Sequence, residues 1–186
     1  MPEIVPGIPA NQWRLSEVGR KRCVRLAELL AVFGPDVFVT SAELKAVETG
    51  RIAAEILGKR WETQEGLQEQ ERGQVAFEGQ EQFEAAIARL FAEPDRLVFG
   101  SETADEAYQR FARAVASAVE RHPDRSVALV THGTVLALYA SRVVGVEPFT
   151  FWKRLGLPAF VVLSLPDCSL LACVEDVESL PSSQLA

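Results

Sequence analysis

Apolar residues follow two kinds of pattern along this chain. In some segments they recur every three or four residues, as on the buried face of a helix, and in others they form short runs, as in a buried strand. Glycine, proline and polar residues separate these segments. The first pattern predicts helices over Ser16–Phe33, Ala42–Leu57, Phe83–Phe91, Thr103–His122 and a segment through Leu136 and Tyr139, and the second predicts strands over Val37–Thr40, Ser126–Thr131, Phe160–Leu165 and Leu170–Val174.

Capping and turn residues mark where several of these elements begin and end. Ser16 is a favourable N-cap, and Thr103 with Glu106 three residues later is typical of a capping box. Gly58 signals the end of the second helix. Pro166-Asp167 indicates the turn of a hairpin between the last two strands.

Two segments are expected to lie outside regular structure. The stretch Trp61–Gly79 is rich in Gln and Glu and contains several glycines, which predicts a solvated surface loop with a short strand at its start. The beginning of the chain carries Pro2, Pro6 and Pro9. Because proline has no N–H to donate to a neighbouring strand, this segment is a poor candidate for a central strand.

Strands that alternate with helices predict an α/β fold. We expect three layers, with a largely parallel sheet and helices on both faces. No internal repeat and no long linker divides the chain, so a single domain over residues 1–186 is expected, with 178–186 as a frayed tail.

Charge and hydropathy exclude several classes of partner. The 19 Lys+Arg and 26 Asp+Glu residues give a net charge of −7, and no basic cluster is present, so nucleic acid is not expected to bind. The longest apolar runs fall far short of the roughly 20 residues that span a bilayer. The N-terminus has no secretory signal pattern, so neither a membrane nor the secretory route is expected.

The cysteines favour a reducing compartment. Cys23, Cys168 and Cys173 show no CxxC spacing, and the two histidines are too few for a zinc-ligand pattern. We therefore expect buried or half-buried thiols, a cytoplasmic protein, and no metal or other cofactor.

Candidate chemistry lies where predicted strands end and helices begin. His132 follows a buried strand and precedes Gly133-Thr134 at the start of a helix, whose free N–H groups favour an anion. Lys45 stands at the corresponding place after the first strand, and it would point toward the same crevice if the strands are neighbours. Glu69 lies in the polar loop, where a carboxylate can act as a general acid if the loop folds over the crevice. Each of these signals is weak by itself.

Together, the order and spacing of the motifs resemble the histidine phosphatase superfamily, which has the phosphoglycerate-mutase-like fold. Members of that family show an N-terminal Arg-His-Gly, then Trp-x-Leu-Ser/Thr-x-x-Gly, Ser-Ser-x-x-x-Arg-Ala, Leu-x-Glu-x-x-x-Gly, a Gly-Glu-Ser-like segment and Val-Ser-His-Gly. The similar segments of this chain are Trp13–Gly19, Thr40–Gly50, Leu67–Gly73, Gly100–Glu102 and Val130–Gly133.

The resemblance implies roles for individual residues. In the family, the first histidine accepts a phosphoryl group, two arginines and a second histidine hold the phosphate, and a glutamate protonates the leaving oxygen. His132 is similar to the second histidine, Glu69 to the acid and Lys45 to the second arginine, while Gly133 and Thr134 would bind substrate. The implied ligand is phosphate or a small phosphorylated metabolite.

Two departures from the family pattern weaken the resemblance at its catalytic centre. No Arg-His pair precedes Trp13, and the other histidine, His122, lies at a predicted helix end. Lys45 replaces an arginine, so one ammonium stands where a bidentate guanidinium is usual. The family's first strand is therefore missing or replaced.

Two explanations stay open. Either the sequence begins too late, because Met1-Pro2-Glu3-Ile4 resembles the segment just after the Arg-His pair, or the protein is a degenerate member that keeps the fold and an anion pocket. Loss of an interior strand leaves backbone groups unpaired. We therefore expect Val37–Thr40 and Ser126–Thr131 to pair directly or to flank a gap, and self-association into a homo-oligomer is a possibility.

The expected function follows from the resemblance and its departures. The family chemistry is phosphomonoester hydrolysis or phosphoryl transfer through a phosphohistidine. Without the nucleophile, this chain is expected to be inactive. The alternatives are a pseudoenzyme that binds a phosphate ester and one that binds a partner protein. The motifs do not separate mutases from phosphatases and do not name a substrate.

Overall fold

Three short parallel strands form the centre of the molecule. The computed structural model describes residues 1–5, 7–73, 75 and 79–179. In it, β1 (Val37–Thr40) lies between β2 (Arg60–Thr63) and β3 (Val127–Val130), and Val37 is aligned with the first residue of each neighbour. All four residues of β1 are buried, as expected for the middle strand of a sheet covered on both faces.

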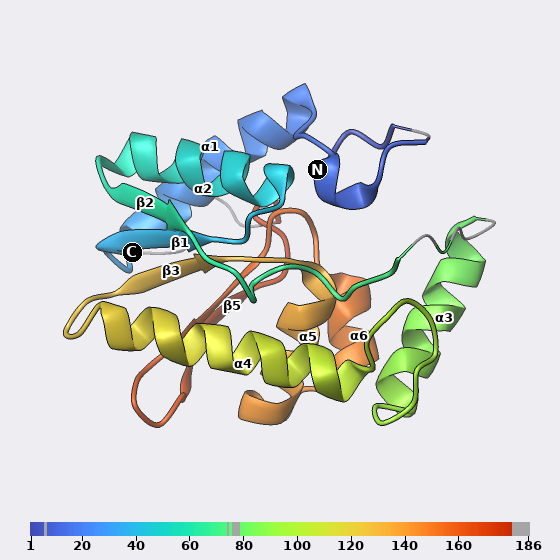
Figure 1. Ribbon diagram of the computed structural model, residues 1–186. Coiled ribbons are helices and arrows are strands. Elements are labelled where there is room, and N and C mark those ends of the chain that lie inside the picture. The colour runs from blue at the N-terminus through green and yellow to red at the C-terminus, as the bar shows by residue number, and fades with distance from the viewer. Residues whose placement is uncertain (6, 74, 76–78, 180–186) are drawn as a thin grey trace.

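Helices cover both faces of this sheet (Figure 1). Helices α1 (Glu17–Ala31) and α2 (Leu44–Leu57) lie on one face, and α4 (Ala104–Arg121) and α5 (Gly133–Val144) lie on the other. Successive strand residues point to opposite faces, so Phe38 packs with alanines of α1 and α2 while its two neighbours pack toward α4 and α5. The predicted three-layer α/β fold is confirmed.

The remaining elements lie beside these layers. Helix α3 (Gln80–Ala92) contacts α6 (Pro148–Arg154), a seven-residue helix that the apolar pattern did not predict because it is so short. A 3₁₀ turn, η1 (Ala10–Gln12), precedes α1. No helix among the described residues is both long enough and apolar enough to cross a membrane.

The last two strands form a separate sheet. β4 (Phe160–Leu163) and β5 (Leu170–Val174) pair antiparallel, which confirms the predicted hairpin. β1 and β3 pair directly, which is one of the two arrangements expected from the sequence.

Between β3 and β4 lies part of a large cavity of about 1710 Å³, which also reaches the carboxyl ends of the strands. We call the part lined by Val127–Val130 and Phe160–Leu163 the inter-strand cavity.

Most predicted boundaries and caps are confirmed. The Ser16 hydroxyl accepts a hydrogen bond from the backbone of Gly19, Thr103 and Glu106 form the capping box, and Gly58 ends α2 with φ 64°. The predicted helix start at Ala42 is wrong, because Glu43 is still extended and α2 begins at Leu44.

Two other expectations need correction. The segment after β2 is not a merely solvated loop, since Leu67 and Gln70 are almost fully buried. The three cysteines are free thiols, but Cys173 is exposed because β5 presents this side chain away from the core. The expected frayed tail begins at Glu178, and residues 180–186 of it lie outside the described part of the chain.

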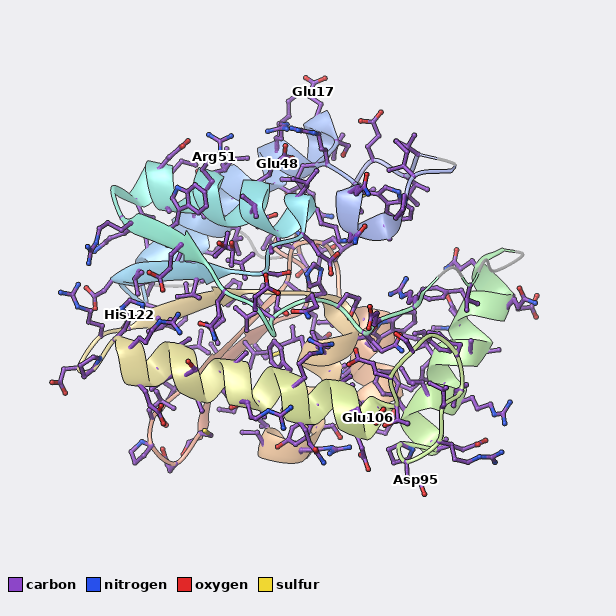
Figure 2. All side chains as sticks on the ribbon, viewed as in Figure 1. Glu17, Glu48, Arg51, Asp95, Glu106 and His122 are labelled. Atoms are coloured by element: carbon purple, nitrogen blue, oxygen red, sulfur yellow. The ribbon has the colours of Figure 1, made fainter. Side chains whose placement is uncertain are left out.

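The proline-containing N-terminal segment packs against α1 and α2 and pairs with the sheet nowhere among the described residues. Its one β-bridge joins Pro2 to Leu15 within the segment itself. The buried carboxylate of Glu48 on α2 accepts a hydrogen bond of 2.8 Å from the backbone N–H of Leu15 and also binds Arg14 and Arg20. Figure 2 shows Glu48 at this side of the molecule.

Candidate active site

Side chains gather where β1, β2 and β3 end. Ser41 and Glu43 follow β1, the segment containing Glu69 follows β2, and His132 follows β3. The hydroxyl of Thr131 donates to the carbonyl of Leu67 at 2.8 Å and so ties the second of these segments to the third. Because the strands are parallel, all three segments meet at one edge of the sheet.

His132 is the centre of this group. It precedes α5 as its N-cap residue and is 8% exposed. Its Nε2 lies 2.9 Å from the Ser41 hydroxyl and 3.4 Å from a carboxylate oxygen of Glu43. Burial lowers the pKa of His132, and the nearby carboxylates of Glu69 and Glu43 only partly oppose that shift. The imidazole is therefore neutral at neutral pH.

Glu43 and Lys45 form an ion pair beside His132. The Lys45 ammonium also donates to the carbonyl of Ala10 at 2.8 Å. Burial raises the pKa of Glu43, but His132, Lys45 and the backbone N–H of Glu69 outweigh burial and hold this pKa below its ordinary value. Glu43 therefore stays ionised and keeps the lysine in place.

Glu69 lies at the N-terminus of α5. Its two carboxylate oxygens accept hydrogen bonds of 3.2 Å from the backbone N–H groups of Thr134 and Val135. The N–H groups of a first helical turn have no acceptor within the helix itself, and a negative charge is stabilised there. The sequence interpretation placed Glu69 near the crevice, and the structure brings it there.

Arg72 is a site residue that the sequence interpretation missed. Its guanidinium lies 3.5 Å from Glu69 and stacks 4.5 Å above the ring of Phe83 on α3. Its charge contributes to the lowered pKa of His132, and so does that of Lys45. The only signal in the sequence was an arginine three residues beyond Glu69 within the family's loop motif.

Arg110 of α4 binds the backbone of the loop that carries Glu69. Arg110 donates to the carbonyl oxygens of Gly66, Gln68 and Glu69 at 2.9, 3.0 and 3.2 Å. Its guanidinium also binds both carboxylate oxygens of Glu102, at 3.1 and 2.6 Å. This fork geometry is specific to arginine, so Arg110 fixes the position of the loop.

The five candidate residues named from the sequence occupy one region. Lys45, Glu69, His132 and Gly133 line the large cavity. Thr134 is fully buried and its hydroxyl has no hydrogen-bond partner in the described chain, so it offers the site its backbone N–H. Gly133 lies under Trp152 of α6, whose indole nitrogen would be 3.6 Å from an added Cβ.

The second histidine is far from this group. His122 follows α4, where its Nε2 lies 3.2 Å from Glu62 of β2, and both line a smaller pocket that includes Val37, the first residue of β1. Figure 2 shows His122 and Glu106 at opposite ends of α4. Within the described residues, no group of three His, Cys, Asp or Glu side chains is arranged to hold a metal ion.

Solved structures similar to this one include several phosphatases. A mycobacterial glucosyl-3-phosphoglycerate phosphatase bound to inorganic phosphate is 27% identical, with a TM-score of 0.59 over 78% of this chain and 75% of that one. The same enzyme with vanadate is also 27% identical, with a TM-score of 0.59 over 78% and 76%. An Entamoeba histolytica phosphoserine phosphatase variant with phosphoserine is 14% identical, with a TM-score of 0.71 over 91% of this chain and 88% of that one, and it shows the fold alone.

Sequence comparison assigns the family directly. No curated protein matches this chain. The sequence profile of the histidine phosphatase superfamily (branch 1), however, matches residues 10–167, which is most of the chain and includes every residue of the site described above. The chain belongs to the histidine phosphatase superfamily, branch 1.

Proposed function

We propose that this chain binds the phosphate group of a small phosphate ester at the site formed by Lys45, His132 and the N-terminus of α5, and that the 186-residue chain alone does not hydrolyse it. The carrying observation is the convergence of His132 with two cationic side chains, Lys45 and Arg72, beside the backbone N–H groups of the first turn of α5. Positive charge and N–H donors of this kind recognise phosphate.

The similar solved structures support binding. One mycobacterial relative holds inorganic phosphate and the same protein holds vanadate, an ion of related shape. The lack of turnover rests on the histidines. Phosphohistidine chemistry needs a nucleophile beside the phosphate, whereas His132 is engaged by Ser41 and His122 lies at the other end of the sheet.

Calorimetric titration with inorganic phosphate tests binding. We expect Lys45→Ala and His132→Ala to weaken the affinity by about tenfold or more, because each removes a donor to the anion. Lys21→Ala removes one positive charge, as Lys45→Ala does, but from an exposed position on α1. It should leave the affinity for phosphate within about twofold of the unmodified chain. Equal effects of all three substitutions would contradict the proposed site.

Hydrolysis of a generic aryl phosphate tests the second part of the proposal. We expect a rate no higher than that of Glu69→Ala, since no covalent intermediate forms. A robust rate that depends on Glu69 would contradict it and would require a nucleophile other than the family's first histidine.

A second candidate function is supported by the inter-strand cavity. β3 and β4 each have one paired neighbour within the described residues, and both line this cavity with apolar side chains. A strand contributed by another polypeptide would satisfy both edges, as buried backbone groups require. Sedimentation of the protein over a range of concentrations tests self-association, and a monomer at all concentrations would exclude a second copy as the source.

A further inference from the structure

The carboxylate of Glu69 occupies the positions that an anion would take at α5. Both of its oxygens accept hydrogen bonds from the first turn of the helix, from Thr134 and Val135, and one lies 3.5 Å from the guanidinium of Arg72. The side chain is 15% exposed, so these contacts are largely shielded from water. A phosphate that used the same donors would have to replace this carboxylate.

We propose that Glu69 is an internal competitor for the phosphate site, whose carboxylate must leave the N-terminus of α5 before phosphate can bind there. This inference rests on the proposed binding function. It adds that breaking the contacts of Glu69 makes the free energy of phosphate binding less favourable. The affinity for phosphate therefore rises when the carboxylate of Glu69 is neutralised or removed.

The displacement involves the side chain and leaves the loop in place. Arg110 holds the carbonyl oxygens of three loop residues, including that of Glu69. The backbone N–H of Glu69 donates to Glu43 at 2.9 Å. With the backbone held on both sides, the carboxylate leaves by rotation about its own side-chain bonds, and the released Arg72 becomes available to the phosphate.

The balance of charge favours this exchange. The groups facing the site are Glu43 and Lys45 at the start of α2, Glu69 and Arg72 on the loop, and His132 after β3. Two carboxylates and two cations offset one another, with His132 neutral. An incoming dianion repels the carboxylate of Glu69 and competes with it for Arg72.

Phosphate titration of two Glu69 variants tests the proposal. Glu69→Ala frees the helix N–H groups, and Glu69→Gln removes the charge at almost the same shape. We expect Glu69→Ala to bind inorganic phosphate at least about tenfold more tightly than the unmodified chain, with Glu69→Gln between them. Glu71→Gln is the matched control, because it removes a carboxylate from an exposed position two residues away and should change the affinity less than about twofold.

The outcomes separate this inference from the function on which it rests. Binding that depends on Lys45 but is unchanged or weakened in Glu69→Ala overturns the inference and leaves the proposed function standing. Equal tightening by Glu71→Gln also overturns it, since the effect would then be one of net charge. Absence of phosphate binding in every variant overturns the proposed function and the inference together.

Discussion

The charged side chains of the site form ion pairs with one another. Lys45 is paired with Glu43, and Arg72 lies beside Glu69. The pattern after each strand predicted where Lys45, Glu69 and His132 would meet. It did not predict Glu43 or Arg72, because the direction of a side chain in an irregular segment depends on contacts far away in the sequence.

Gly100 is a residue where a side chain cannot be accommodated. Its φ is 78°, and an added Cβ would lie 2.0 Å from the carbonyl oxygen of Glu71. We expect Gly100→Ala to lower the free energy of unfolding by about 3 kcal/mol or more, from strain and backbone overlap together. Denaturant unfolding measures this.

Gly145 provides the control for that substitution. It has a similar φ of 80°, but nothing lies within 4 Å of an added Cβ. Gly145→Ala should therefore cost about 1 kcal/mol, which is the conformational part alone. Equal losses of unfolding free energy at the two positions would show that the backbone of Glu71 leaves room for a side chain at Gly100.

Glu48 gives the protein a dependence of stability on pH. Burial raises the pKa of Glu48, but the N–H of Leu15 and the guanidinium groups of Arg20 and Arg14 outweigh burial and lower this pKa below its ordinary value. A carboxyl group with a lowered pKa in the folded state stabilises the fold above its unfolded pKa, and this stabilisation is lost as the pH falls through the folded pKa. We expect Glu48→Gln to cost about 1 to 3 kcal/mol near pH 7 and much less near pH 3.

Urea unfolding at both pH values measures this effect. Glu17 is the control, because its side chain points to solvent at the start of α1 (Figure 2) and is 86% exposed. Glu17→Gln should change the free energy of unfolding by less than about 0.5 kcal/mol at either pH. If the loss of unfolding free energy in Glu48→Gln does not diminish toward acid pH, the ionised carboxylate of Glu48 is not the source of the stabilisation.

Among the elements, the segment between β2 and α3 differs most from its predicted character. Its Gln- and Glu-rich composition indicated a solvated loop, yet Leu67 and Gln70 are buried. The amide of Gln70 donates to the carbonyl oxygens of Phe99 and Glu102, and Arg110 supports the segment from α4. Composition averages over a segment, whereas these contacts are made by single residues from distant parts of the chain.

The hold of α4 on this loop can be tested with Arg110→Lys. A lysine keeps the charge but cannot make five hydrogen bonds in a fork. We expect a loss of about 2 kcal/mol in the free energy of unfolding and faster amide exchange in residues 66–72. Arg113→Lys, an exposed position on the same helix, should change neither quantity. Unaltered exchange in Arg110→Lys would show that other contacts fix the loop.

At the scale of the whole molecule, the sheet is divided. β3 pairs with β1 on one side and faces the inter-strand cavity, shared with β4, on the other. All four residues of β3 are partly exposed although the strand is apolar. Among the described residues β3 is therefore an edge strand that borders the cavity, which is consistent with the predicted loss of an interior strand.

Hydrogen exchange measures this division directly. We expect every amide of β1 to be protected, because β1 is paired on both sides. Amides of β3 that point away from β1 should exchange at least about tenfold faster than those that point toward it. Uniform protection along β3 would show that another strand, from a second chain, fills the cavity in solution.

The sequence by itself determined the layers and the family. Helical and strand patterns, caps such as Thr103 with Glu106, and the segments that carry Glu69 and His132 are local features, because they depend on residues within one or two turns of each other. Spacing between motifs was enough to bring Lys45, Glu69 and His132 to one edge of the sheet, since parallel strands end together.

Only the tertiary structure decided which side chains of the site contact one another and which strands pair. The pairing of β1 with β3 across 86 intervening residues, the fork of Arg110 and the placement of the Glu69 carboxylate on α5 all join distant segments. Such contacts are selected by packing and by the need to satisfy buried polar groups, which no local pattern records.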